Sequence, residues 1–170
     1  MRAWPSPHLP VVPGEPISLR LHDVARDEVA PVEPADPARL YVCGVTPYDT
    51  THMGHAATYV TFDLVNRALR DGGRQVTYVQ NVTDVDDPLF ERAARDGVDW
   101  RDLGQDQIAL FLEDMTALGV IPPEHFMGVM ESMPQIIEAV QRLVDRDVTY
   151  EVVEDGVRDT YLDLTAAGGL

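Results

Sequence analysis

The chain has 170 residues, 45% of them hydrophobic and 25% charged, which is typical of one globular domain with a sizeable core. Its net charge is −16 and every cation is an arginine, so a nucleic-acid partner is disfavoured because a polyphosphate would be repelled at long range. It has no signal-peptide pattern, no run of about 18 apolar residues and a single cysteine, Cys43, so we expect a cytoplasmic monomer without a membrane partner.

Residues 1–38 are predicted to form an N-terminal extension. Residues 1–16 contain five prolines and should run extended over the surface. Residues 17–23 alternate apolar and polar side chains, which predicts a strand. We expect residues 39–170 to form the first part of a larger domain that continues beyond this chain.

A strand–helix–strand unit is predicted over residues 39–80. Residues 39–45 are typical of a buried strand, and 74–79 of a second one. Between them, apolar residues from Ala57 to Ala68 fall on one helical face, and Gly72-Gly73 ends the helix. The two strands should therefore be parallel, and the connections that follow them should lie at the sheet edge where ligands bind in open α/β folds.

The remainder is predicted to be mostly helical. Helices are expected over 87–97, over 99–119 and from about residue 132, and residues 149–164 are typical of a hairpin. The third helix should turn its apolar residues inward; these are Ile137, Val140, Leu143 and Val144. The fold class is thus α/β, a Rossmann-like doubly wound parallel sheet with a helical insertion after its second strand.

Residues 45–56 carry the most informative motif, because they join the first strand to the start of the helix. Unpaired N–H groups at a helix start favour an anion. His52 and His55 lie on one side of the first turn, and Gly54 between them lets a base or phosphate approach closely. Taken alone, such a histidine pair is more often incidental surface or a partial metal site. In this context it predicts hydrogen bonds to phosphate oxygens during attack on phosphorus.

The stretch Thr51–His55 resembles the HIGH signature of class I aminoacyl-tRNA synthetases. Around it, residues 41–54 resemble the opening of cysteinyl-tRNA synthetase, and residues 78–87 resemble the second block of the same family.

Two departures from that pattern narrow the resemblance. Where the tRNA enzymes typically have Asn-Ala-Arg, this chain has His55-Ala56-Ala57, and where they have lysine it has Pro88. Both departures, with residues 46–49 and 54–59, are similar to the mycothiol-pathway cysteine ligase family. The resemblance covers residues 39–118 closely and the flanks more loosely.

This resemblance implies an ATP-dependent ligase with L-cysteine, Mg²⁺-ATP and glucosaminyl-inositol as its small-molecule substrates. Cysteine would become cysteinyl-adenylate and then pass to the glucosaminyl-inositol amine. His52 and His55 would be catalytic. The residues implied to bind the adenylate are Cys43, Gly44, Val45, Thr46, Gly54, Thr58, Asn81, Val82 and Thr83.

Cys43 lies where both families place one ligand of a zinc ion. A zinc ion suits a thiolate substrate better than a hydroxyl. The residues alone favour a simpler interpretation, a small apolar core cysteine, because no partner ligand is evident. Likewise we expect Asp86 or Asp87 to cap the next helix, while magnesium would arrive with ATP.

The chain contains no lysine, so the lysine-bearing loop that completes ATP binding in class I synthetases is not in it. We therefore expect this chain alone to be inactive and its parent to be the enzyme. Two alternatives stay open: a cysteinyl-tRNA synthetase, which differs in its acceptor, and a truncated nucleotide-binding relative that catalyses nothing.

Overall fold

A computed structural model describes residues 1–11 and 13–168, which divide into two compact units, Met1–Val129 and Met130–Leu170. Val12, within the extended segment predicted over 1–16, and Gly169 and Leu170, which end the predicted 39–170 domain, lie outside the described residues.

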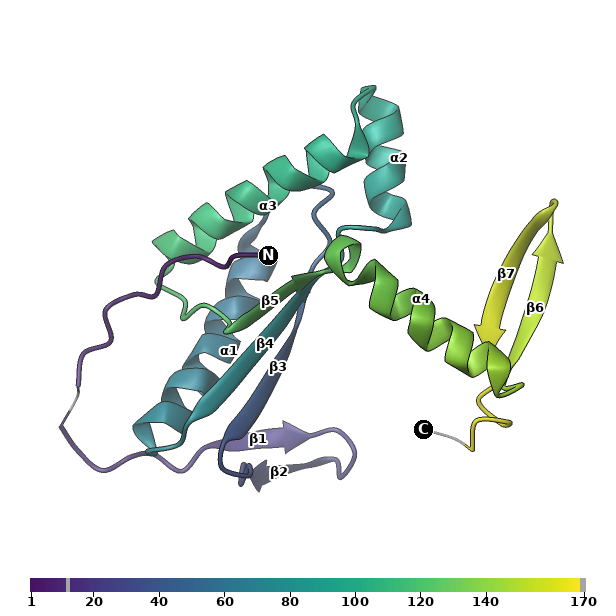
Figure 1. Ribbon diagram of the computed structural model, residues 1–170. Helices are drawn as coiled ribbons and strands as arrows, with labels where there is room; N and C mark the ends of the chain where they lie inside the picture. Colours follow the sequence, from purple (N-terminus) through teal and green to yellow (C-terminus); the bar gives the residue numbers. More distant parts are fainter. Residues whose placement is uncertain (12, 169–170) are drawn as a thin grey trace. The chain divides into compact units, whose positions relative to one another are not determined.

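The first unit is built on a parallel sheet of three strands in the order β3-β4-β5 (Figure 1). Helix α1 connects the first pair, and helices α2 and α3 lie between β4 and β5 in the chain. The bounds are β3 Ala38–Val45, α1 Met53–Asp71, β4 Val76–Val82, α2 Asp87–Asp96, α3 Trp100–Ala117 and β5 His125–Gly128. A small antiparallel hairpin, β1 Arg20–Asp23 with β2 Glu28–Pro31, precedes them. The α/β class and the strand–helix–strand unit are confirmed.

Local signals place the helix ends. Asp86 and Asp99 each accept a backbone N–H at the start of α2 and α3, as N-cap residues do. Gly97 ends α2 with a φ of 68°, a left-handed conformation that glycine adopts without a steric cost. Capping by Asp86 was predicted from the sequence and is confirmed.

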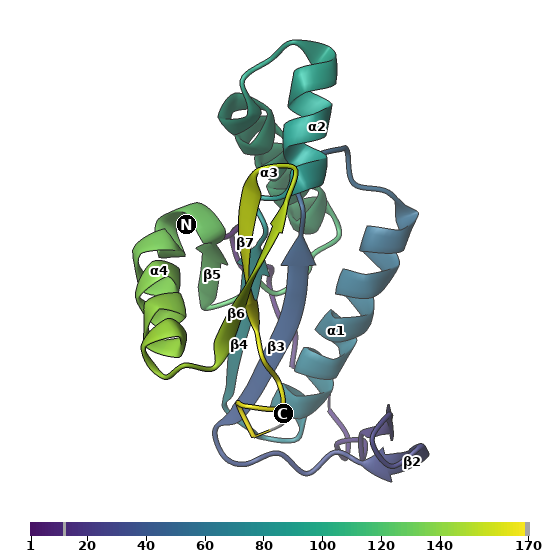
Figure 2. The ribbon, with the colours of Figure 1, turned by 90° about the vertical axis from the view of Figure 1, so that its right-hand side faces the viewer.

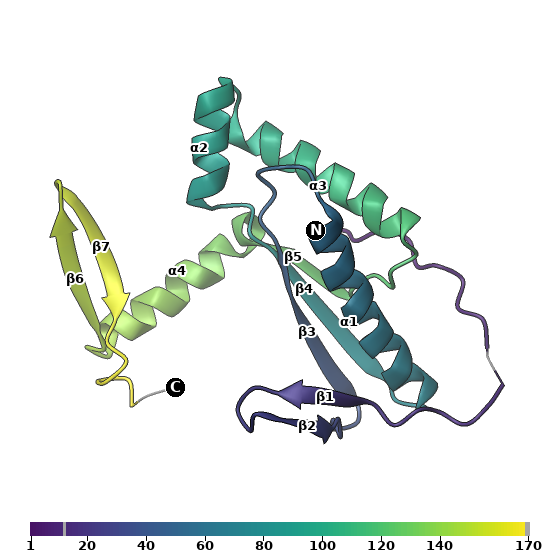
Figure 3. The ribbon, with the colours of Figure 1, turned by 180° about the vertical axis from the view of Figure 1, so that it is seen from behind.

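One face of the sheet carries the core. Val42, Tyr78 and Val82 alternate with outward-facing neighbours along β3 and β4 and pack against Phe111 and Met115 of α3. Figures 2 and 3 show α1 running along this sheet. Phe111 and Met115 are each only 1% exposed, and Leu112 packs against this cluster partly buried.

Two strand predictions needed correction. Strand β4 runs to Val82 rather than ending at 79, because the polar Gln80 is fully buried and accepts a hydrogen bond from the Tyr78 hydroxyl at 2.6 Å. Strand β5 was not predicted at all. Strand β5 is only four residues long, and its sequence does not show a strand pattern. It is a strand because it pairs with β4.

The N-terminal segment was predicted to lie on the surface, and for Trp4 this is wrong. Its indole is 4% exposed, donates its N–H to the Val120 carbonyl oxygen at 2.7 Å, and packs edge-on against Phe111 and Phe126. A tryptophan buries more apolar area than the extended prolines around it, so it anchors the segment in the core.

The second unit contains helix α4, Val129–Asp145, and an antiparallel hairpin of β6, Thr149–Glu154, and β7, Val157–Leu162. The hairpin is as predicted. The prediction that α4 turns its apolar face inward is wrong, because Ile137 is 62% exposed, Val140 43% and Val144 42%. A single two-stranded hairpin has too little surface to bury such a face. No helix among the described residues is long and apolar enough to cross a membrane.

The Trp4 anchor generates a stability prediction. Trp4→Phe should lower the free energy of unfolding by about 1–3 kcal/mol, because the Val120 carbonyl loses its buried donor, and Trp4→Ala by about 3–5 kcal/mol. Urea unfolding measures both. Trp100→Phe, at the more exposed ring beneath Arg101, is the control and should change little. Equal losses for Trp4→Phe and Trp100→Phe would contradict the anchor.

Candidate active site

A β-bulge shapes the end of β3. Val42 pairs with Gln80 and Val45 with Val82, so two residues of β3, Cys43 and Gly44, face the single residue Asn81 of β4. The Asn81 Oδ1 atom accepts hydrogen bonds from the Gly44 N–H and the Tyr41 hydroxyl, each at 2.9 Å. A Cβ at position 44 would lie 1.4 Å from the Asn81 carbonyl oxygen, so the bulge requires glycine.

Part of the segment 81–83, which was predicted to bind the adenylate, already forms hydrogen bonds within the protein. Asn81 also donates from Nδ2 to the Thr83 hydroxyl at 3.2 Å, and the Thr83 N–H donates to the Val45 carbonyl at 2.9 Å. Val45 and Val82 are buried, at 4% and 0% exposure. Any ligand contact by these two valines therefore comes from the backbone.

The bulge leaves the Cys43 side chain exposed, which rules out the interpretation of Cys43 as a small core residue. Among residues 1–11 and 13–168, no three His, Cys, Asp or Glu side chains gather closely enough to hold a metal ion. A zinc ion at Cys43 would therefore need ligands from beyond the described residues, and the zinc site stays a prediction.

Three contacts hold the loop between β3 and α1 against the helical insertion. The Thr46 hydroxyl lies 3.4 Å from an Asp86 carboxylate oxygen, and Asp49 forms an ion pair with Arg92 at 3.1 Å. Next to the histidine motif, the Thr51 hydroxyl donates to Asp114 of α3. Asp86 at the start of α2, Arg92 of α2 and Asp114 of α3 thus fix the loop that leads to the histidine pair.

The two histidines form a reciprocal cap at the start of α1. His52 is the N-cap residue, and its Nδ1 accepts the Gly54 N–H at 3.1 Å; the His55 Nδ1 accepts the His52 N–H at 3.2 Å. An Nδ1 atom that accepts carries no proton, so each neutral ring has its proton on Nε2. The rings lie 4.1 Å apart, centroid to centroid, and each offers an N–H donor.

Burial of His55, and secondarily the neighbouring His52, lower the pKa of the His55 imidazole, which favours the neutral ring. Position 54 favours glycine for a steric reason as well as for the predicted access of a ligand, because a Cβ there would lie 2.8 Å from the His52 ring. Thr58 donates its hydroxyl proton to the Gly54 carbonyl at 3.0 Å, leaving its oxygen free to accept.

The predicted site residues therefore fall into two groups, one at the ends of β3 and β4 and one at the start of α1. Their roles toward a ligand stay predictions. Sequence reasoning missed Tyr41, Arg92 and Asp114 as supporting residues. Tyr41 shares its strand face with Cys43, and this spacing could have identified Tyr41 from the sequence. No local sequence feature identifies Arg92 or Asp114.

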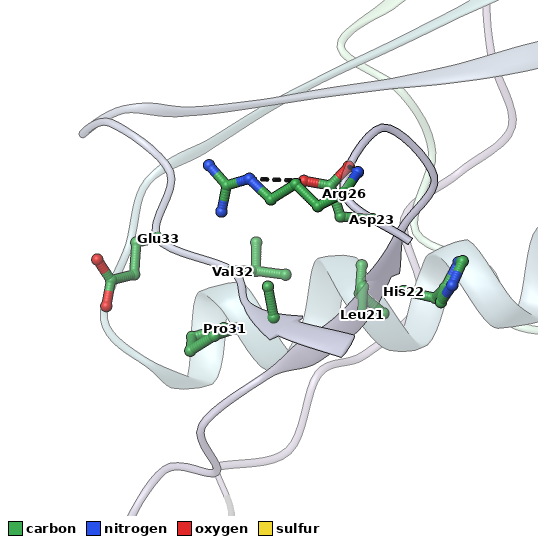
Figure 4. A pocket seen from close by; sticks show the side chains of 8 residues that line it. Leu21, His22, Asp23, Arg26, Pro31, Val32 and Glu33 are labelled. Atoms are coloured by element: carbon green, nitrogen blue, oxygen red, sulfur yellow. Dashed lines mark hydrogen bonds and ion pairs between the residues drawn. The ribbon is translucent and has the colours of Figure 1, made fainter. Parts of the chain in front are cut away.

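A cavity of about 410 Å³ lies elsewhere (Figure 4). It is formed by the β1–β2 hairpin, and its Asp23 carboxylate already accepts backbone N–H groups of its own turn and pairs with Arg26. None of its lining residues belongs to the histidine motif or the strand ends, so we do not assign it to the site.

Comparison with known proteins identifies a family and its relatives. Residues 30–168 match the family described as the class I (C) tRNA synthetase catalytic domain. The L-cysteine:1D-myo-inositol 2-amino-2-deoxy-alpha-D-glucopyranoside ligase of Geodermatophilus obscurus is 57% identical over 99% of this chain, and that of Gordonia bronchialis 58% over 95%. The chain spans 40% and 39% of the length of these relatives.

Solved structures show the same fold. Mycobacterium tuberculosis methionyl-tRNA synthetase with methionyl-adenylate superimposes with a TM-score of 0.63 at 17% identity, over 75% of this chain and 33% of that one. A ternary LeuRS–tRNA–LeuAMS complex from Agrobacterium radiobacter K84 gives 0.57 at 18% identity, over 71% and 16%.

The bulge makes a steric prediction. Gly44→Ala should lower the free energy of unfolding by more than about 3 kcal/mol, because its Cβ overlaps a backbone oxygen that cannot move without breaking the β3–β4 pairing. Gly104→Ala within α3 is the control. Its Cβ would meet Leu89 at 3.5 Å, an ordinary contact, so it should be neutral or stabilise by about 0.5–1 kcal/mol. Chemical denaturation of both variants decides; a stable Gly44→Ala protein would exclude the bulge.

The lowered pKa of His55 makes a pH prediction. Because the folded protein prefers the neutral ring, this contribution to stability is complete above the unfolded pKa of about 6.5 and is lost as the pH falls through the lower folded pKa. His55→Gln keeps a capping acceptor but does not titrate, so it should flatten the pH dependence of unfolding below pH 6.5. His8→Gln, in the exposed N-terminal segment, should leave it unchanged. Parallel curves for His55→Gln and the parent would contradict the neutral cap.

Proposed function

Because the chain belongs to the family of class I (C) tRNA synthetase catalytic domains, we propose that it is part of an ATP-dependent ligase that joins L-cysteine to the amine of glucosaminyl-inositol in mycothiol biosynthesis. The observation that carries the proposal is the identity of 57–58% to relatives named as this ligase, over nearly the whole chain. The exposed Cys43 and the capped histidine pair are consistent with it.

In the first step, an oxygen of the cysteine carboxylate attacks the α-phosphorus of Mg²⁺-ATP. A P–O bond forms to the carboxylate, the bond to the β-phosphate bridge breaks, and pyrophosphate leaves with that electron pair. His52 and His55 donate from Nε2 to oxygens of the reacting phosphate, where negative charge increases in the transition state. Neutral donors locked in one tautomer need no reorganisation as that charge develops.

In the second step, the acceptor amine attacks the carbonyl carbon of the cysteinyl-adenylate. A C–N bond forms, the C–O bond to AMP breaks, and the ammonium proton is lost as AMP leaves. Thr46, Thr58 and Thr83 would hold the adenylate with hydroxyl groups, and Asn81 would position Thr83 through its amide. Cys43 would lie beside the substrate thiol.

We further propose a zinc ion that Cys43 would help to hold and that would bind the substrate thiolate, with its other ligands outside the described residues. A cytoplasmic monomer without a nucleic-acid partner fits the acidic composition. The competing function is that of a cysteinyl-tRNA synthetase, and the observation that supports it is the description of the matching family.

The test uses protein from the complete reading frame with ATP, Mg²⁺ and cysteine, and follows AMP release with glucosaminyl-inositol or with tRNA. We expect release that depends on the amino sugar and does not respond to tRNA. His55→Gln should lower the rate by roughly 10²–10³-fold, whereas His22→Gln, on the β1–β2 hairpin, should leave it unchanged. AMP release that depends on tRNA alone would establish the tRNA enzyme instead.

A further inference from the structure

A second cavity, of about 260 Å³, lies between the loop before α1 and helix α2. Tyr48 and Asp49 of the loop form one side. Pro88, Glu91, Arg92 and Arg95 of α2 form the other. The loop side follows Thr46 in the chain and the helix side follows Asp86, and the Thr46 hydroxyl contacts the Asp86 carboxylate. The cavity therefore adjoins the strand ends where the adenylate is proposed to bind.

The charges in this cavity are not those of an anion site. Arg92 is paired with both Asp49 and Asp96, and Arg95 is paired with Asp96. The hydrogen bond from the Thr50 N–H, and after it the one from Arg92, hold the pKa of Asp49 below its usual range, so this carboxylate stays ionised. Among the described residues none pairs with the Glu91 carboxylate, whereas both arginines of the lining already pair with carboxylates. A phosphate group would have to compete with Asp49 and Asp96 for these guanidinium groups and would lie beside the Glu91 carboxylate.

The remaining lining suits a polyol. The Tyr48 ring, 42% exposed, and the Pro88 ring are flat apolar surfaces for the C–H face of a saturated ring. Glu91 can accept hydrogen bonds from hydroxyl or ammonium groups, and the Arg95 guanidinium, only partly used by Asp96, can donate to hydroxyl oxygens. A volume just under the roughly 300 Å³ of the smallest drug-sized pockets fits one six-membered ring.

We propose that this cavity binds the polyol portion of the amine acceptor, with Glu91 as a specificity-determining residue. The inference rests on the proposed function, since it names where the acceptor of that reaction binds. It places the acceptor on the α2 side of the adenylate, so that its amine faces the strand ends while its hydroxyl groups lie against α2.

The test is steady-state kinetics on protein from the complete reading frame, with two readouts. One is the KM for glucosaminyl-inositol from AMP release, and the other is cysteine-dependent ATP–pyrophosphate exchange, which needs no acceptor. Glu91→Gln should raise the acceptor KM about ten-fold, as expected for loss of a charged hydrogen-bond acceptor, and the change in exchange should be much smaller. Glu91→Asp should restore part of the affinity.

Glu113→Gln is the matched control, an acid-to-amide change at an exposed position of α3 outside the cavity, and should alter neither readout. An acceptor KM for Glu91→Gln within two-fold of the parent would overturn the acceptor site while leaving the ligase function intact. Exchange without any transfer to the amino sugar would overturn both the ligase function and the site inferred from it.

Discussion

The site depends on the β-bulge at Cys43 and Gly44. Without the extra residue, the alternation of β3 would put either Cys43 or Val45 on the wrong face of the sheet. With it, Val42 and Val45 both enter the core and Cys43 faces outward at the strand end. The Asn81 Oδ1 atom accepts from the Gly44 N–H in the bulge, and the Asn81 Nδ2 atom donates to the Thr83 hydroxyl, so the bulge also positions Thr83.

The helical insertion gives the second constraint. Asp86, Arg92 and Asp114 reach from α2 and α3 to the loop before α1, so the insertion fixes the loop from which the histidine cap begins. In a chain of net charge −16, the arginines of α2 pair with neighbouring carboxylates, Arg92 with Asp49 and Asp96 and Arg95 with Asp96. That distribution favours a small uncharged or cationic acceptor over a polyanion.

What the sequence predicted well has local causes. The ends of α1, α2 and α3 follow from caps and glycines, and the histidine motif follows from the strand-to-helix change in period. The errors are nonlocal. Trp4 finds its partner 116 residues away, β5 acquires its strand character from β4, and the exposure of α4 reflects how little its own unit can cover.

The site shows the same division. Residue types and spacing, in their strand-to-helix context, predicted the histidine pair, whereas only the family resemblance assigned Cys43 to the site. The hydrogen bonds that Asn81 already makes within the protein could not be predicted from its residue type. Two of the three positions that depart from the cysteinyl-tRNA synthetase pattern have identifiable roles in the structure: His55 completes the cap, and Pro88 lines the cavity between the loop before α1 and α2.

The central claim is that these strand ends form a cysteine-activating site. It is tested most directly by ATP–pyrophosphate exchange on protein from the complete reading frame, with each of the common amino acids supplied in turn. The account predicts exchange with cysteine alone, and its loss in Cys43→Ala. Exchange driven by methionine or leucine, the amino acids of the solved structural neighbours, or exchange that survives Cys43→Ala, would contradict it.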